Sequence, residues 1–310
     1  MKIVCVESLG LGRERFREFE EHYRAMGHGF TYYMDRREDE PTLVERMREA
    51  QVAVISNIKL PATVLAQCPD LRYLSVAFTG LDHIDLDYCS GHGIAVQNAA
   101  GYSTTAVSEL AVGMMLDLLR QVTTLDGAVR GGQGRGTFLG RELRGKTVGI
   151  VGTGAIGTAT ARLLLAFGAR VVAWSRTCRP EVKAMGVEYV SLPSLLQMCD
   201  IVSLHVPLNA ETRSLIGPEQ LALMKPTALL VNTARGPVCD IAAVADALNE
   251  GRIGGAAFDV FEQEPPLPDN HPLLAARNCL LTPHVAFATE ESFAARADIV
   301  FGHVDGYLLK

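Results

Sequence analysis

Several features that would place a chain outside the ordinary globular proteins are missing from this 310-residue sequence. No apolar run approaches the ~20 residues that a membrane-spanning helix needs, so we expect no contact with a membrane. The first residues, 1–6, lead directly into a strand pattern and lack the length and cleavage site of a signal peptide. We therefore expect a cytoplasmic protein.

Paired cysteines and basic runs are missing as well. The seven cysteines are scattered at positions 5, 68, 89, 178, 199, 239 and 279, with no C-x-x-C spacing. An odd number of distant cysteines indicates reduced thiols, mostly in the core, and predicts no metal site. The formal net charge is −6 and no long basic run opposes it, which argues against nucleic acid as a partner.

Short apolar runs that alternate with helical patterns occupy most of the chain. Alternation in units this short predicts an α/β protein built on parallel sheets. Strands are expected at residues 3–7, 30–34, 52–56, 71–78, 94–98, 147–151, 170–174, 201–204, 228–232, 255–259 and 279–281. The longest helical pattern, 103–119, carries a broad apolar stripe that predicts either a core helix or an interface, and a final helix is expected at 290–309.

A glycine-rich turn follows the strand expected at 147–151. Gly152, Gly154 and Gly157 have the G-x-G-x-x-G spacing, and a helical pattern follows them. In a dinucleotide-binding domain these glycines permit the tight turn, the close approach of a pyrophosphate and the packing of helix on strand. Residues 140–147 also match a P-loop pattern, but Lys146 and Thr147 open a strand instead of a helix, so we reject it.

Three polar residues come after apolar strand runs in the second half. Arg235, Glu264 and His284 should meet at the carboxyl edge of one parallel sheet, where ligands bind. An arginine fork binds a carboxylate, and a histidine beside a carboxylate exchanges protons near neutral pH. Each residue alone has an ordinary surface interpretation, but the three together favour an active site.

The segments around these residues resemble the signatures of the D-isomer-specific 2-hydroxyacid dehydrogenases. They are Asn-Thr-Ala-Arg-Gly at 232–236, Phe-Asp-Val-Phe-Glu-Gln-Glu-Pro at 258–265 and Thr-Pro-His-Val-Ala at 282–286. Residues 204–208, 223–226 and 251–257 extend the match, and 77–85 resembles the substrate loop of the family. The resemblance covers nearly the whole chain.

By this resemblance, two Rossmann-like or flavodoxin-like domains enclose a cleft. Residues 1–98 with 288–310 would form the substrate-binding domain, and 99–287 the dinucleotide-binding domain. The resemblance also implies a homodimer built around the nucleotide domain.

The resemblance assigns roles to individual residues. Arg235 would bind the substrate, His284 would be the acid/base, Glu264 its partner, and Asp259 would hold the nicotinamide carboxamide. The substrate would also meet Phe78, Tyr102 and the backbone N–H groups of Thr79 and Gly80. Further cofactor contacts are expected at Gly152, Gly154, Ala155, Ile156, Gly157, Ser175, Arg176, Thr177, His205, Val206, Pro207, Thr212, Thr233 and Ala234.

The choice between NAD and NADP depends on the end of the strand at 170–174. NAD-binding sheets usually carry an acidic residue there, which hydrogen-bonds the ribose. This chain has Ser175, Arg176 and Thr177 instead, and these favour the 2′-phosphate of NADP. The alternative is that Arg176 stacks on the adenine and either cofactor binds.

The leading hypothesis is an oxidoreductase that interconverts a small 2-keto acid and its D-2-hydroxy acid. Within the class, the alternatives are phosphoglycerate or hydroxypyruvate as substrate, or formate without an acid/base step. From another class, the same fold serves as a nucleotide-sensing binding module. The intact set of Arg235, Glu264 and His284 favours the enzyme.

Overall fold

The computed structural model describes residues 1–310 and forms two compact units. One unit comprises Met1–Ser103 and Ala288–Lys310, and the other comprises Thr104–Phe287. The sequence analysis ended the first segment at residue 98. The unit extends to Ser103, because Tyr102 packs against the guanidinium of Arg296 in the same unit.

The first unit contains a five-stranded parallel sheet. Its strands are β1 (Lys2–Cys5), β2 (Gly29–Tyr32), β3 (Val52–Ile55), β4 (Tyr73–Val76) and β5 (Ala95–Asn98). They are arranged in the order β2-β1-β3-β4-β5. Every residue of β3 and β4 is buried because both strands have neighbours on each side and helices on the faces.

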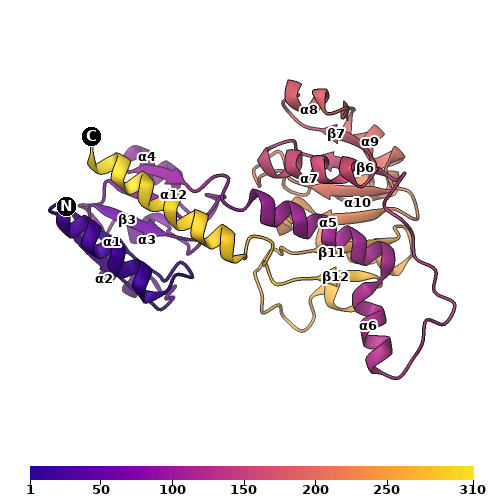
Figure 1. Ribbon diagram of the computed structural model, residues 1–310, viewed down its shortest axis with the longest axis horizontal. Helices are drawn as coiled ribbons and strands as arrows, with labels where there is room; N and C mark the ends of the chain where they lie inside the picture. Colours follow the sequence, from indigo (N-terminus) through magenta and orange to yellow (C-terminus); the bar gives the residue numbers. More distant parts are fainter. The chain divides into compact units, whose positions relative to one another are not determined.

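Five helices belong to this unit: α1 (Arg13–Ala25), α2 (Glu40–Met47), α3 (Ala62–Leu65), α4 (Leu86–Gly91) and α12 (Glu290–Leu308). α12 lies beside α1, although almost the whole chain separates them in sequence (Figure 1). The rings of Phe19 and Phe301 stack with centroids 3.7 Å apart, and Arg15 pairs with Asp298 at 2.7 Å. The last helix of the chain thus completes the core of the first unit.

The second unit contains a seven-stranded parallel sheet. Its strands are β6 (Thr147–Val151), β7 (Arg170–Trp174), β8 (Glu188–Tyr189), β9 (Ile201–Leu204), β10 (Leu229–Asn232), β11 (Gly255–Phe258) and β12 (Cys279–Leu281). Their order is β12-β11-β10-β9-β6-β7-β8. β6 therefore pairs with β9, and the strand order reverses between them. Ligands bind at such a reversal, at the carboxyl ends of the strands.

Helices cover both faces of this sheet. The helices of this unit are α5 (Thr104–Arg120), α6 (Val122–Arg130), α7 (Ala155–Ala166), α8 (Pro180–Ala184), α9 (Leu192–Met198), α10 (Pro218–Leu223) and α11 (Ile241–Asn249). α5 and α7 pack together in one hydrophobic cluster, whereas α9, α10 and α11 contribute to another. Crossover connections of one hand, as parallel strands favour, place helices on opposite faces on the two sides of the reversal.

The apolar stripe of α5 lies in the core. Val112, Met114, Met115 and Leu118 are buried in the cluster that α5 shares with α7 and the sheet. The sequence allowed either a core helix or an interface, and these residues belong to the core. α6, by contrast, contains no buried residue and extends away from the sheet (Figure 1).

Helical patterns in the sequence also predict helices at 13–26, 41–50, 61–67, 193–198, 219–223 and 241–250, whereas no pattern predicts α4, α6, α8 or β8. α4 and α8 are short, at six and five residues, and β8 has only two. Such lengths give no readable period. In α6, two threonines and a glycine dilute the apolar pattern. None of the helices has both the length and the apolar character needed to cross a membrane.

Gly157 allows α7 to pack closely on β6. A Cβ at this position would collide with the carbonyl oxygen of Gly152, and backbone cannot move aside cheaply. Gly113, on the exposed side of α5, is the opposite case, because a Cβ there would meet no atom within 4 Å. The two glycines form a matched pair for a stability test.

We expect Gly157→Ala to destabilise the second unit by about 1–3 kcal/mol, the usual cost of overpacking. Gly113→Ala should stabilise it by roughly 0.5–1 kcal/mol, because alanine favours a helix interior. Urea unfolding followed by the fluorescence of Trp174, the only tryptophan, measures both. Equal stability of the two variants would contradict the packing argument.

Candidate functional site

The turn after β6 has the conformation that a dinucleotide requires. Gly152 adopts φ +98°, and a Cβ on it would lie 2.6 Å from the carbonyl oxygen of His205. Gly154 is the N-cap of α7, and a Cβ there would meet no atom within 4 Å. The start of α7, with Ala155 and Ile156, thus presents its free N–H groups to open space that suits a pyrophosphate.

A tyrosine that the sequence analysis did not identify braces this turn. The hydroxyl of Tyr189 in β8 donates to Thr153 Oγ1 at 2.8 Å and accepts from the backbone N–H of Arg179 at 3.1 Å. Thr153 is buried between the two glycines of the turn. Tyr189 therefore connects the glycine turn to the segment after β7. Only strand pairing, which places β8 next to β7, brings it there.

The segment after β7, residues 175–177, contains the residues expected to contact the adenosine ribose or its 2′-phosphate. Ser175 is partly buried, and Arg176 and Thr177 are exposed. Arg176 Nη1 lies 3.7 Å from Glu211 Oε2, with side-chain exposures of 82% and 76%. The sequence analysis found no carboxylate in this segment, and Glu211 supplies one from the loop after β9.

His205 and Val206 follow β9 directly and border the glycine turn. The Nε2 atom of His205 lies 2.9 Å from Ser203 Oγ, and burial lowers the pKa of His205 to about 4. The imidazole is therefore neutral at neutral pH. In the loop after β9, Thr212 Oγ1 donates to the carbonyl of Pro207 at 2.5 Å, and this hydrogen bond fixes the conformation of the loop.

The end of β10 positions Thr233, Ala234 and Arg235. Buried Asn232 accepts from the N–H of Ala234 at 3.0 Å and donates to the carbonyl of Arg235 at 2.9 Å. The Oγ1 atom of Thr233 is buried without a hydrogen-bond partner in the protein. An orphaned hydroxyl at the carboxyl edge of a nucleotide-binding sheet fits a site that is completed by a polar ligand.

His284 and Glu264 form a direct pair. Nδ1 of His284 lies 2.9 Å from Glu264 Oε1, and their side-chain exposures are 15% and 46%. His284 adopts φ +53°, a left-handed conformation that costs a residue with a side chain ~1–3 kcal/mol and concentrates at functional sites. The ring of Phe287 meets the imidazole edge-on at 5.4 Å.

Asp259 holds the loop that carries His284. Its carboxylate is fully buried and accepts from Thr282 Oγ1 at 2.5 Å, from the N–H of Val285 at 2.9 Å and from the N–H of Ala286 at 2.8 Å. Burial raises the pKa of Asp259, and these three hydrogen bonds oppose the rise. The structure thus gives Asp259 a role in shaping the loop, and its proposed contact with a carboxamide remains a prediction.

The three predicted catalytic residues follow adjacent strands. β10 pairs with β11 and β11 pairs with β12, with their carboxyl ends aligned. Arg235, Glu264 and His284 come after these ends in that order. This placement brings an arginine and a histidine–carboxylate pair to the same edge of the sheet, and such groups can bind a carboxylate and transfer a proton.

The predicted substrate residues of the first unit follow β4 and β5. Phe78 and Tyr102 are buried, whereas Thr79 is exposed. The side chain of Asn98 donates to the carbonyl of Thr79 at 2.6 Å, and the N–H of Ala99 donates to the carbonyl of Phe78 at 3.2 Å. No group of three or more His, Cys, Asp or Glu side chains is arranged to hold a metal ion.

Comparisons with known proteins agree with this geometry. Residues 112–286 match the model of the NAD-binding domain of D-isomer specific 2-hydroxyacid dehydrogenases. Glyoxylate reductase of Thermofilum pendens is 43% identical over 261 residues, which cover 82% of this chain and 76% of that protein.

Two solved structures are similar over almost the entire chain. D-lactate dehydrogenase of Aquifex aeolicus, complexed with NAD and lactic acid, has a TM-score of 0.86 at 31% identity, covering 98% of this chain and 95% of its own. An acyclic imino acid reductase in complex with NADPH and D-Arg has a TM-score of 0.90 at 27% identity, covering 100% and 97%. This chain therefore belongs to the D-isomer-specific 2-hydroxyacid dehydrogenases, oxidoreductases that interconvert 2-keto and 2-hydroxy acids with a nicotinamide cofactor.

Proposed function

We propose that this protein reduces a small 2-keto acid of the glyoxylate and hydroxypyruvate class to the D-2-hydroxy acid. The observation that carries the proposal is the contact of His284 with Glu264, after strands next to the one that Arg235 follows. The glyoxylate reductase similarity supports a substrate of this size. A binding module would have no need of a histidine held in a left-handed conformation next to a carboxylate.

Arg235 binds the carboxylate of the substrate and polarises the neighbouring carbonyl with its guanidinium. In the first unit, the N–H groups of Thr79 and Gly80 are the proposed ligands of the substrate carboxylate. In the doubly protonated imidazole of His284, Nδ1–H donates to Glu264 and the proton on Nε2 passes to the carbonyl oxygen. The bound nicotinamide supplies the hydride. The glycine turn and the buried hydroxyl of Thr233 are among the groups that hold the cofactor.

We expect His284→Gln to lower kcat by about 10² to 10⁴, the usual worth of general acid–base help. Dinucleotide affinity should stay nearly unchanged, because His284 does not take part in the glycine turn. Glu264→Gln should lower kcat less, since the imidazole keeps a hydrogen-bond partner. Steady-state assays of keto-acid reduction, with dinucleotide titration by fluorescence, measure these effects.

A second histidine–glutamate pair provides the control. His271 lies 3.4 Å from Glu262 in the same unit. Glu262→Gln makes the same change in this second pair, which has no role in the proposed chemistry, and kcat should stay near that of the wild type. Wild-type turnover in His284→Gln would contradict the assignment of His284 as the acid/base.

We further propose that the cofactor is NADP(H). No residue of the segment after β7 is acidic, and Arg176 projects into solvent beside Ser175 and Thr177. The pair of Arg176 with Glu211 is highly exposed and therefore weak, so a phosphate can replace the carboxylate. The similar imino acid reductase structure contains NADPH.

Arg176→Ala should lower the ratio of kcat/KM for NADPH over NADH by roughly one to two decades, because a hydrogen bond to a charged group contributes about 1.5–3 kcal/mol. Glu211→Gln should raise the same ratio, because it removes a negative charge beside the phosphate site. Assays with both cofactors measure the ratios. If wild type prefers NADH and neither variant changes the ratio, Arg176 does not bind the phosphate.

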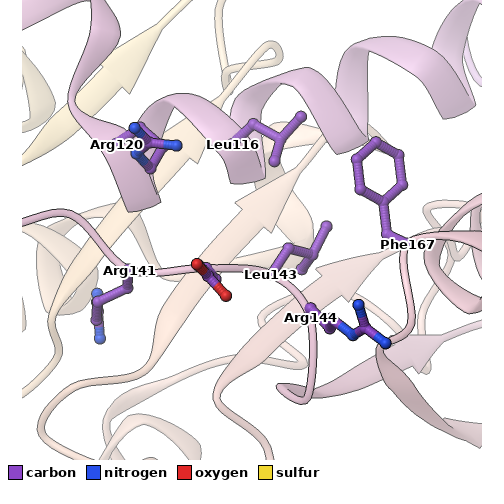
Figure 2. A pocket seen from close by; sticks show the side chains of 7 residues that line it. Leu116, Arg120, Arg141, Leu143, Arg144 and Phe167 are labelled. Carbon is purple, nitrogen blue, oxygen red and sulfur yellow. The ribbon is translucent and has the colours of Figure 1, made fainter.

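We also propose that the protein is a homodimer through the surface around α6. Val122 and Val129 of α6 and Leu139 after it are 59%, 70% and 81% exposed. Beside the end of α5 lies a pocket of about 230 Å³ (Figure 2), which is lined by Leu116, Arg120, Arg141, Glu142, Leu143, Arg144 and Phe167. An amphipathic helix with no buried residue needs a cover for its apolar side, and a second copy supplies it.

Light scattering should therefore give twice the 33.5 kDa mass of one chain. Val129→Asp should shift the protein toward monomer, because it places a charge in the apolar contact. Leu309→Asp, at a residue 78% exposed near the end of α12, should leave the dimer intact. A monomeric wild-type protein at micromolar concentration would count against the proposal.

A further inference from the structure

A buried cation lies at the carboxyl ends of the strands in the first unit. Arg296 of α12 is only 3% exposed, although a guanidinium is expensive to remove from water unless it is well hydrogen-bonded. Burial lowers the pKa of Arg296, and neighbouring Tyr102 and Glu7 oppose the shift. The proposed mechanism gives this residue no role.

The guanidinium hydrogen-bonds three loops that follow three different strands. Its Nη2 donates to the carbonyl of Leu9 after β1 at 2.5 Å. Its Nη1 donates to Ser56 Oγ after β3 and to the carbonyl of Ala77 after β4, both at 3.3 Å. Ser56 Oγ also donates to the carbonyl of Ala77 at 3.3 Å, so two donors fix this carbonyl.

Aromatic rings keep the guanidinium in place. Its central carbon lies 4.3 Å from the ring centroid of Phe293 and 5.6 Å from that of Tyr102, within the range of cation–π attraction. Phe293 also shapes the loop after β1, since a Cβ on Gly10 would lie 2.6 Å from its ring. The first turns of α12 thus form a rigid support under these loops.

We propose that Arg296 is a positioning residue that fixes the segment from Ala77 to Gly80 for binding of the substrate carboxylate. This inference rests on the proposed function, which assigns the N–H groups of Thr79 and Gly80 to that carboxylate. Arg296 holds the Ala77 carbonyl at the start of the segment, and Asn98 holds the Thr79 carbonyl near its end. With both ends fixed, the N–H groups keep one direction before the substrate arrives.

Arg296→Lys keeps the positive charge but loses the planar fork that reaches three loops, and Arg296→Met removes both. Both variants should raise KM for the keto acid by about tenfold or more, because small displacements of a binding group are costly. The dissociation constant of the dinucleotide should stay near wild type, because the glycine turn is in the other unit. Ser56→Ala, which removes one of the two donors to Ala77, should raise KM less.

Arg46→Lys is the matched control. The side chain of Arg46 is 7% exposed in the same unit and donates to the carbonyl of Val6 at 2.7 Å and to Asp35 at 2.8 Å, away from residues 77–80. Its KM for the keto acid should match wild type. Circular dichroism confirms folding of each variant, and if Arg296→Met does not fold, Arg296→Lys and Ser56→Ala carry the test.

Two results would overturn the inference. One is a folded Arg296→Lys enzyme with wild-type KM for the keto acid, and the other is an equal rise of KM in Arg46→Lys. Both are distinct from a failure of the proposed function, in which the wild-type protein itself reduces no 2-keto acid.

Discussion

The parallel pairing of β6 with β9 is the constraint on which the nucleotide site depends. The register runs from Val148 opposite Ile201 to Val151 opposite Leu204, so the two strands end level with each other. The chain then turns toward opposite faces of the sheet and leaves an opening at the reversal of strand order. Gly152 and His205, the next residues, approach so closely that a side chain at position 152 would collide with backbone. A shift of register would close this opening.

The polar residues at the carboxyl edge of the second sheet adopt a conformation with an unfavourable free energy, which the surrounding hydrogen bonds offset. His284 carries the strain of a left-handed backbone, about 1–3 kcal/mol. Asp259 accepts three hydrogen bonds from the same loop, and each bond to a charged group contributes about 1.5–3 kcal/mol. The buried carboxylate can therefore stabilise the loop in the conformation that brings His284 to Glu264.

Local positive charge contrasts with the charge of the whole chain. The formal net charge is −6, which by itself disfavours the approach of an anionic keto acid or a dinucleotide. Arg235 follows β10 and Arg176 follows β7, at the edge where ligands bind. In the first unit, Arg296 adds a buried cation beneath the loop that follows β4. In the proposed function, anion binding therefore rests on Arg235 and Arg176, and Arg296 acts only through the loop that it positions.

Much of the fold could be predicted because it depends on local pattern. The strands β9 and β12 lie where their apolar runs predict them, at Ile201–Leu204 and Cys279–Leu281. The spacing of Gly152, Gly154 and Gly157 predicted the turn, because the backbone of such a turn requires glycine at fixed positions. The pairing of His284 with Glu264 also followed from their places after strands. The short helices α4 and α8 and the strand β8 were missed, because each helix has less than two turns and β8 has only two residues.

Contacts between distant segments were decided by the tertiary structure alone. Tyr189 reaches Thr153 only because β8 pairs with β7, and Glu211 reaches Arg176 only because two loops end on the same edge of the sheet. The stripe of α5 fits a core helix and an interface equally well in sequence, and packing against α7 placed it in the core. Nothing in the sequence indicated a role for Arg296, because the carbonyl and hydroxyl groups to which it donates lie more than 200 residues away in the chain. The sequence thus determined which groups stand at each strand end, and the folding of the sheets determined which of them meet, because hydrogen bonds act over a few ångströms and not along the chain.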